Sequence, residues 1–308
     1  MKYLITGGAG FIGSHIVEEL VRRRQNVIVL DNLSTGYLRN LDSVKDKITF
    51  IKGDITKKPD VIKAMKGVDF VCHLAASLSV IESVAKPEKY IKNNVLGTLN
   101  LLKIAHKNKV KKFVLSSTCA TYGTASVFPT PENYVGVKLS PYAYTKYSAE
   151  EICRYYSAVF NLPTVVLRYF NVYGPRQDAS SSYAGVIPIF SKLMSQGKQP
   201  KIFGNGKQTR DFVGVKDVAL ANINACLSDI QNGEAINIGS SIETSVNELY
   251  SKISKLLNFQ IPAIYQPARA GEAQRALGNI SKMRKILKII PKTLDDELES
   301  TVRWYQSA

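Results

Sequence analysis

A tyrosine and a lysine stand four residues apart near the middle of the chain, in the stretch Ser140-Pro-Tyr142-Ala-Tyr-Thr-Lys146. On a helix this spacing places both side chains on one face. A phenol normally loses its proton near pH ~10, and an ammonium group beside it lowers that value, so the pair suits general base catalysis. Because the chain has 16 tyrosines, such a pair also arises by chance. The catalytic interpretation therefore depends on the motifs that accompany the pair.

The N-terminal residues predict a turn that binds a dinucleotide. Residues 2–6 have the pattern of a short buried strand, a glycine-rich run from Gly7 to Gly13 follows at once, and Ile12, Ile16 and Leu20 then recur at helical spacing. Glycines at these positions let the backbone turn tightly and allow a diphosphate to lie on the start of the helix.

The second predicted strand, residues 27–30, ends in Asp31, which comes 18 residues after Gly13. An acid at this place in the fingerprint accepts hydrogen bonds from both hydroxyls of the adenosine ribose and repels a 2′-phosphate, which favours NAD over NADP. Alternatively, Asp31 is a turn residue. The glycine run before it favours the ligand-binding interpretation.

The composition is that of a globular protein, with 308 residues of which 45% are hydrophobic. No apolar run approaches the roughly 20 residues of a membrane span, and strand and glycine run leave no room for a signal peptide, so we expect a cytoplasmic protein without membrane insertion. Four scattered cysteines without Cys-x-x-Cys pairs, and three histidines in helix or strand contexts, predict no metal site.

The formal net charge is +16, which favours attraction to anions such as nucleotide sugars, nucleic acid or an acidic membrane surface. The lysines are spread along the chain, however, and no nucleic-acid-binding motif accompanies them. We therefore expect a solvated basic surface and no nucleic acid partner.

Predicted strands and helices alternate along the first half of the chain, which is typical of an α/β fold with a doubly wound parallel sheet, the Rossmann type. Short apolar strands recur at residues 48–51, 70–72, 113–115 and 164–167. Beyond Tyr169, prolines and glycine turns break the chain into shorter elements. We expect an NAD-binding domain at residues 1–168 and a smaller C-terminal α/β substrate domain at 169–308, with segments near 212–238 able to return to the first domain.

Further short motifs follow one another in order along the chain: Asp31-Asn-Leu-Ser-Thr-Gly36, Gly53-Asp54-Ile55, His73-Leu-Ala-Ala76, Asn93-Asn94-Val95, Ser116-Ser-Thr118, Arg168-Tyr-Phe-Asn-Val-Tyr-Gly174 and Arg210-Asp-Phe-Val213. Together with the glycine run and the Tyr142–Lys146 pair, they resemble the extended short-chain dehydrogenase/reductase superfamily, and within it the nucleotide-sugar 4-epimerases of the UDP-galactose 4-epimerase type. The resemblance covers essentially the whole chain.

The resemblance implies a chemical activity. Such an enzyme inverts C4 of a UDP-hexose with bound NAD, through a transient 4-keto sugar that turns over within the pocket. It implies that Tyr142, as tyrosinate, removes the proton of the 4-hydroxyl, that Thr118 helps to move this proton, and that Lys146 and the cationic nicotinamide ring lower the pKa of the tyrosine. It also implies a homodimer formed through helices at residues 94–105 and 142–156.

Residue by residue, the resemblance assigns two sets of contacts. The cofactor contacts are Gly7, Gly10, Phe11, Ile12, Gly13, Asp31, Asn32, Asp54, Ile55, Leu74, Ala75, Ala76, Asn94, Ser116, Tyr142, Lys146 and Tyr169. The substrate contacts are Ser79, Thr118, Asn171, Val186, Phe203, Arg210, Arg269, Glu272 and Ala276. Of these, Glu272 replaces the aspartate that is more usual in the family.

Within the family, Ala276 stands where epimerases confined to UDP-glucose and UDP-galactose carry a tyrosine, so the resemblance favours UDP-N-acetylglucosamine and UDP-N-acetylgalactosamine as additional substrates. Alternatively, Ala276 is only a small packing residue. Because dehydratases place an acid directly after the catalytic hydroxyl residue and this chain has Cys119 there, simple epimerisation is favoured. UDP-glucuronate epimerisation remains an alternative, as does a non-catalytic NAD-binding regulator.

Overall fold

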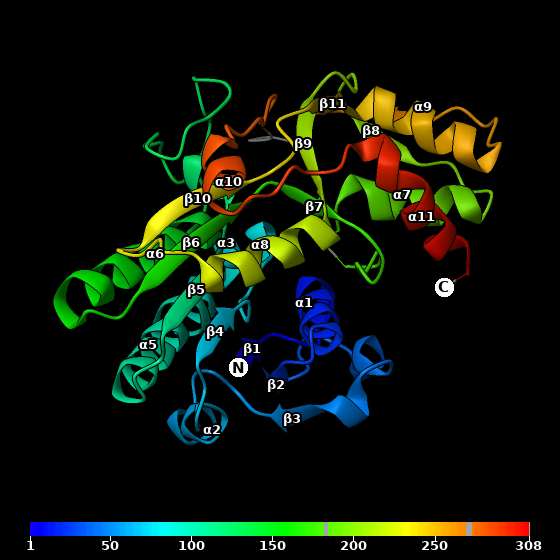
Figure 1. The fold of residues 1–308 in the computed structure, drawn as a ribbon. Helices are drawn as coiled ribbons and strands as arrows, with labels where there is room; N and C mark the ends of the chain where they lie inside the picture. Colours follow the sequence, from blue (N-terminus) through cyan, green and yellow to red (C-terminus); the bar gives the residue numbers. More distant parts are fainter. Residues whose placement is uncertain (182–183, 269–272, 308) are drawn as a thin grey trace.

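A parallel sheet of seven strands forms the centre of the molecule (Figure 1). The computed structural model describes residues 1–181, 184–268 and 273–307. The sheet order is β3-β2-β1-β4-β5-β6-β10, and every neighbouring pair is parallel. The strands are β1 (Lys2–Thr6), β2 (Asn26–Asp31), β3 (Ile48–Lys52), β4 (Phe70–His73), β5 (Lys112–Thr118), β6 (Thr164–Tyr169) and β10 (Glu234–Ile238).

The strand order confirms the doubly wound sheet predicted from the sequence. From β1 the chain builds outward through β2 to β3, and it then returns to place β4 on the other side of β1. Sheets of this kind bind ligands at the carboxyl ends of the strands beside this switch point.

Helices cover both faces of the sheet and bury two apolar cores. Tyr3 and Ile5 of β1 belong to one core and Leu4 belongs to the other. Because both faces are covered, the strands are apolar throughout instead of alternating with polar residues. The first face carries α1 (Phe11–Arg22), α8 (Val215–Leu227) and α10 (Ser281–Ile286), and the second carries α2 (Lys58–Ala64), α5 (Gly97–Lys107) and α6 (Pro141–Phe160).

Helix α6, which carries the tyrosine and the lysine, begins and ends at clear local signals. The Ser140 hydroxyl accepts a hydrogen bond from the amide of Ala143 at 3.1 Å, and Pro141 occupies the first helical position, where a missing N–H costs nothing. Asn161 ends the helix in a left-handed conformation. The signals at Ser140 and Pro141 fix the start of α6 and therefore place Tyr142 in its first turn.

The segment between β4 and α5 lies beside α6 and contains an irregular helical turn. A π-helical turn, η3 (Ile91–Leu96), follows the short helices α3 (Val80–Ala85) and α4 (Pro87–Tyr90) and runs directly into α5. Such turns are frequent at functional sites because the extra residue in the turn redirects neighbouring side chains. Three short 3₁₀ turns complete this half of the chain: η1 (Leu38–Leu41), η2 (Lys45–Lys47) and η4 (Cys119–Tyr122).

A smaller group of elements surrounds a third apolar core, which includes Tyr173, Phe190 and Leu298. Its two small sheets are β7-β9-β11 and β8-β12. The elements are β7 (Asn171–Tyr173), α7 (Val186–Ser195), β8 (Lys201–Phe203), β9 (Thr209–Gly214), β11 (Glu243–Ser245), α9 (Val246–Leu257), β12 (Ile264–Gln266) and α11 (Leu294–Ser307).

Between β9 and β11 the chain returns to the large sheet, where α8 packs against α1 and β10 pairs with β6. The division into two domains at residue 168 stays a prediction. Under this division, α8 and β10 belong to the C-terminal part of the chain but pack against the NAD-binding domain. None of the helices within the described ranges is long and apolar enough to cross a membrane.

Candidate active site

A cavity of about 770 Å³ lies along the carboxyl ends of the central strands. Most of the predicted cofactor contacts and all three predicted catalytic residues line it. These lining residues are Gly7, Gly10, Phe11, Ile12, Gly13, Asp31, Asn32, Asp54, Ile55, Leu74, Ala75, Ala76, Ser116, Thr118, Tyr142, Lys146 and Tyr169, together with Ser79 from the predicted substrate contacts.

The glycine turn is built so closely that side chains do not fit. Gly7 has a φ of +70°, and a Cβ on it would lie 2.8 Å from the amide nitrogen of Ala75. A Cβ on Gly13 would lie 2.2 Å from the carbonyl oxygen of Gly7. Gly10 precedes α1 and has no side chain to bond the first-turn amides, and that turn carries no acid. The start of α1 therefore fits an anionic diphosphate, as the sequence predicted.

Asp31 is the last residue of β2, and its carboxylate is fixed by the backbone. Its Oδ2 accepts a hydrogen bond from the amide of Ala9 at 2.9 Å, and its Oδ1 accepts one from the amide of Leu33 at 2.8 Å. Burial raises the pKa of this carboxyl group. Each oxygen has a further lone pair, so the group remains able to accept bonds from ribose hydroxyls in the cavity.

Asn94 lies outside the cavity lining, although the sequence interpretation assigned it a cofactor contact. Its Oδ1 accepts a hydrogen bond from the amide of Ser77 at 2.8 Å, and its Nδ2 donates to Thr145 Oγ1 at 3.2 Å. It therefore ties the loop after β4 to α6. Its neighbour Asn93 does line the cavity and donates to Ser77 Oγ at 2.8 Å.

Thr118, Tyr142 and Lys146 meet where β5 ends beside the first turns of α6. The Nζ of Lys146 donates a hydrogen bond to the carbonyl oxygen of Ser116 at 2.5 Å, which holds the lysine against the strand. Thr118 Oγ1 accepts a hydrogen bond from the amide of Ala120 at 3.1 Å. The structure thus brings together a hydroxyl, a phenol and an ammonium group that the sequence had placed 24 and four residues apart.

Burial controls the proton affinities of these groups. It raises the pKa of Tyr142 to about 12, and the hydrogen-bonding contact with the Thr118 hydroxyl lowers it by a smaller amount. Burial also lowers the pKa of Lys146 to about 8, while Glu150 acts in the opposite direction. Burial is thus the largest influence on the pKa of Tyr142 in the protein without its cofactor. The lowering of this pKa by Lys146 and the nicotinamide ring stays a prediction.

The predicted substrate contacts fall into separate places. Ser79 lines the cavity and caps α3 by accepting a hydrogen bond from the amide of Glu82 at 3.1 Å. The side-chain amide of Asn171 donates to the carbonyl oxygen of Asp211 at 3.2 Å, and the backbone amide of Ala276 donates to the carbonyl oxygen of Thr209 at 3.3 Å. Both residues therefore adjoin Arg210 on β9. These three residues meet around β9 but do not line the cavity.

Two further predicted substrate contacts lie on other elements. Val186 begins α7 and Phe203 ends β8, and neither lines the cavity. Arg269 and Glu272 lie outside the described residues. Their roles stay predictions.

Two loops line the cavity without having been predicted to do so. Ser34 to Tyr37 come from the loop after β2, and Arg176 to Asp178 come from the loop after β7. Tyr37 donates its hydroxyl to Asp178 Oδ2 at 3.1 Å, and Arg176 donates to the carbonyl oxygen of Asn40 at 2.9 Å. The available signal was the position of both segments directly after strands, at the edge where such sheets bind ligands.

The comparisons with known proteins agree with this geometry. The model of the "NAD dependent epimerase/dehydratase family" matches residues 3–239. A putative UDP-glucose 4-epimerase of Methanocaldococcus jannaschii is 41% identical over 306 residues, which are 99% of this chain and 98% of that protein.

Two solved structures share the whole fold at 38% sequence identity and a TM-score of 0.95 each. One is a UDP-glucose 4-epimerase from Thermotoga maritima with UDP-glucose, for which the match covers 100% of this chain and 99% of that chain. The other is a UDP-N-acetylglucosamine 4-epimerase from Methanobrevibacter ruminantium in complex with UDP-N-acetylmuramic acid, for which it covers 99% and 98%.

These likenesses confirm three predictions made from the sequence: the protein is an enzyme, it uses NAD, and its relatives act on nucleotide sugars. The glycine turn, the carboxylate at the end of β2 and the Thr118, Tyr142 and Lys146 group are the parts of the structure that such a cofactor requires. The chain belongs to the NAD-dependent epimerase/dehydratase family.

Proposed function

We propose that the protein inverts C4 of UDP-hexoses through a transient 4-keto sugar. The observation that carries this proposal is the placement of Thr118, Tyr142 and Lys146 in the same cavity as the dinucleotide turn. Bound NAD would supply the acceptor, and later the donor, of the hydride that leaves C4 and returns to the opposite face of the ketone. Gly10, Gly13 and Asp31 are suited to hold its diphosphate and ribose.

In this proposal the side chains of the chain move the proton. Tyr142 takes the proton of the 4-hydroxyl group and returns it at the end of each cycle, and Thr118 bonds the same sugar oxygen and hands the proton across. Lys146 holds its ammonium group against the carbonyl of Ser116, which keeps the charge beside the tyrosine. Burial is the main cause that raises the pKa of Tyr142, and the positive charges of Lys146 and of the bound cofactor would act in the opposite direction and favour tyrosinate.

The residue after Thr118 supports epimerisation over dehydration. Dehydration needs additional acid and base groups near C5 and C6, and this position holds Cys119. Burial raises the pKa of the Cys119 thiol to about 12, so the thiol stays protonated and does not replace a carboxylate. UDP-glucuronate 4-epimerisation is the alternative that uses the same three catalytic residues.

The proposed substrates include UDP-N-acetylglucosamine and UDP-N-acetylgalactosamine besides UDP-glucose and UDP-galactose. Two observations support this breadth: Ala276 adjoins Arg210 through the strand β9, and one structural neighbour is a UDP-N-acetylglucosamine 4-epimerase. A small residue at this place leaves room for an acetamido group, which a tyrosine ring would occupy.

A homodimer in the cytoplasm is part of the same proposal. Its support is a set of exposed apolar side chains in or beside the two segments expected to pair, residues 94–105 and 142–156. Leu96, Tyr144 and Tyr155 lie within these segments, and Ile91 and Val159 lie just outside them. Light scattering in solution measures this directly, and a molecular mass equal to one chain would contradict the dimer.

The test of the function is product analysis after separate incubation with UDP-glucose, UDP-N-acetylglucosamine and UDP-glucuronate. We expect the C4 epimers of the first two, and none of them with Tyr142→Phe, which removes the phenolic proton carrier and retains the ring. Epimerisation of UDP-glucuronate alone would favour the alternative. Normal turnover by Tyr142→Phe would refute the assigned mechanism.

A further inference from the structure

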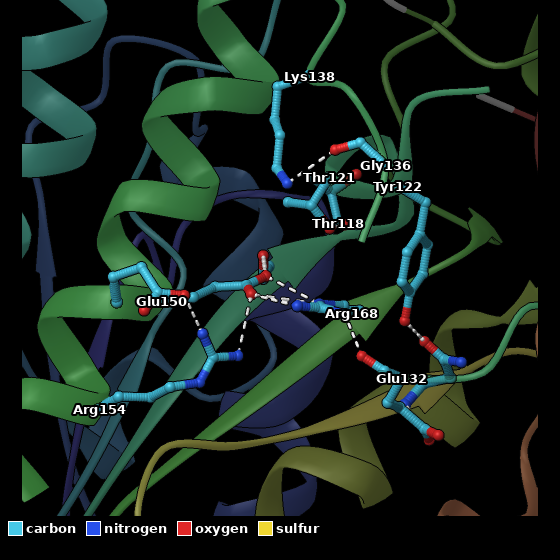
Figure 2. A network of polar contacts seen from close by, with 12 residues as sticks. Thr118, Thr121, Tyr122, Glu132, Gly136, Lys138, Glu150, Arg154 and Arg168 are labelled. Carbon is cyan, nitrogen blue, oxygen red and sulfur yellow. Dashed lines mark hydrogen bonds and ion pairs between the residues drawn. The ribbon is translucent and has the colours of Figure 1, made fainter. Parts of the chain in front are cut away.

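A buried ion pair joins helix α6 to strand β6 (Figure 2). Glu150 on α6 has no exposed surface, and the side chain of Arg168 on β6 is 5% exposed. The Nη2 of Arg168 donates to Glu150 Oε2 at 2.6 Å, and its Nε lies 3.1 Å from Oε1. Neither residue lines the cavity, and none of the roles assigned above uses them.

The carboxylate of Glu150 is joined to the strand that ends in Thr118. Ser117 donates its hydroxyl to Glu150 Oε1 at 2.5 Å, and Ser117 stands between Ser116, whose carbonyl oxygen holds Lys146, and Thr118 itself. Glu150 also follows Lys146 by one helical turn. One buried carboxylate therefore contacts the neighbours of two of the three catalytic residues.

Arg168 extends the pair to the segment that connects β5 with α6. It donates to the carbonyl oxygen of Glu132 at 2.9 Å, and its guanidinium group lies 4.8 Å from the centre of the Tyr122 ring (Figure 2). Tyr122 in turn donates its hydroxyl to Asn237 Oδ1 at 2.6 Å. Through these contacts the pair joins β5, β6, β10 and the connecting segment at the level of the site.

A buried ion pair is a poor means of gaining stability, because the cost of removing two charges from water commonly cancels their attraction. Replacing such a pair by apolar side chains of similar size often leaves the stability of a protein unchanged or raises it. The combination of a full set of hydrogen bonds with contacts to the catalytic strand and helix therefore indicates a role in the geometry of the site.

We propose that Glu150 is a positioning residue: its carboxylate fixes the end of β5 to α6, so that Thr118, Tyr142 and Lys146 keep their relative places, and it supplies the negative charge next to Lys146. This inference rests on the proposed function of that group. Arg168 is its close counter-ion at 2.6 Å, and Arg154, one turn further along α6, is a second one at 3.6 Å.

The charge has a measurable consequence for Lys146. Burial lowers the pKa of Lys146 and the nearby carboxylate of Glu150 raises it, so loss of that charge lowers the pKa further. His73 on β4 is neutral, since burial and the charge of Lys146 lower its pKa to about 3. Of the other titratable groups, Cys153 acts on Lys146 and Tyr142 precedes it by one turn of the same helix. Arg154 on α6 and Arg168 on β6 both pair with Glu150.

The experiment compares Glu150→Gln with Glu151→Gln, which removes an exposed carboxylate from the next position of the same helix. A double variant, Glu150→Met with Arg168→Met, removes both charges of the buried pair, and Arg154 keeps its ion pair with Glu151. For each folded protein we measure kcat, KM, the pH profile and the melting temperature. Competitive acetylation of Lys146, followed by mass spectrometry of its peptide, gives the pKa of Lys146 without any turnover.

For Glu150→Gln and for the double variant we expect kcat to fall by roughly 10- to 100-fold with little change in KM, because small displacements of reacting groups cost rates of this order. The alkaline limb of the pH profile and the acetylation pKa of Lys146 should both move to lower pH. Glu151→Gln should match the wild type in kcat, KM, the pH profile and the acetylation pKa of Lys146.

Two results would overturn the inference. One is a Lys146 titration in Glu150→Gln that equals the wild type, and the other is a double variant that regains normal kcat together with normal stability, which would assign the pair to stability alone. An inactive wild-type protein would instead contradict the proposed function, and the acetylation measurement would still decide the role of Glu150.

Discussion

A methyl group added to Gly13 or to Gly10 should have different consequences, although both glycines lie in the same turn. On Gly13 the new Cβ would lie 2.2 Å from the carbonyl oxygen of Gly7 and 2.7 Å from the Cα of Gly8, so backbone must move by most of an ångström. On Gly10 the nearest atom, again the Gly7 oxygen, is 3.2 Å away, which a small adjustment relieves. Overpacking of the kind expected at Gly13 costs about 1–3 kcal/mol of stability.

We therefore expect Gly13→Ala to lower the free energy of unfolding of the cofactor-free protein by about 1–3 kcal/mol and to weaken NAD binding, because α1 no longer starts beside the turn. Gly10→Ala should unfold like the wild type but bind NAD poorly, since its methyl group occupies the place of the diphosphate.

Denaturant unfolding of cofactor-free protein measures the free energy of unfolding, and isothermal titration with NAD measures the affinity for the cofactor. Gly185→Ala is the control for the substitution itself, because its new Cβ would lie 3.6 Å from the side chain of Gln177 and the residue lies outside the turn. An unchanged unfolding midpoint for Gly13→Ala, or full NAD affinity in Gly10→Ala, would refute the reasoning.

Three further predictions concern selectivity and pH. Asp31→Ala should reduce the preference for NAD over NADP, because the carboxylate that repels a 2′-phosphate is gone; competition binding tests this, and an unchanged ratio of affinities counts against it. Ala276→Tyr should suppress turnover of UDP-N-acetylglucosamine and spare UDP-glucose; equal losses on both substrates would contradict the open pocket. Activity should decline as the pH rises through about 8, because Lys146, with its pKa lowered by burial, then loses its positive charge; a rate that stays constant from pH 7 to 10 would exclude this role.

The local features of this protein could be predicted from the sequence. The glycine run, the strand that ends in Asp31 and the spacing of Tyr142 and Lys146 each lie within one element or one turn, where backbone geometry fixes the relation between neighbours. The alternation of apolar strands with helices predicted the doubly wound sheet, and because all its strands are parallel, their carboxyl ends meet at one edge.

Relations between distant residues were decided by the tertiary structure. The hydrogen bonds of Asn94 to Ser77 and Thr145 join residues far apart in the sequence, while its contact with the cofactor stays a prediction. The pairing of Glu150 with Arg168 could not be predicted, although Arg168 begins one of the motifs, because it depends on which helix packs over which strand.

Burial, too, is a property of the folded molecule and not of a residue type. The sequence supplied the phenol of Tyr142 and the ammonium group of Lys146, and it predicted that the second would lower the pKa of the first. Packing of α6 against β5 removes both from water and disfavours their charged forms, which raises the pKa of Tyr142 and lowers that of Lys146. The sequence thus determined which groups are present and in which local order, while the fold determined their proton affinities, because desolvation depends on the atoms that surround each group.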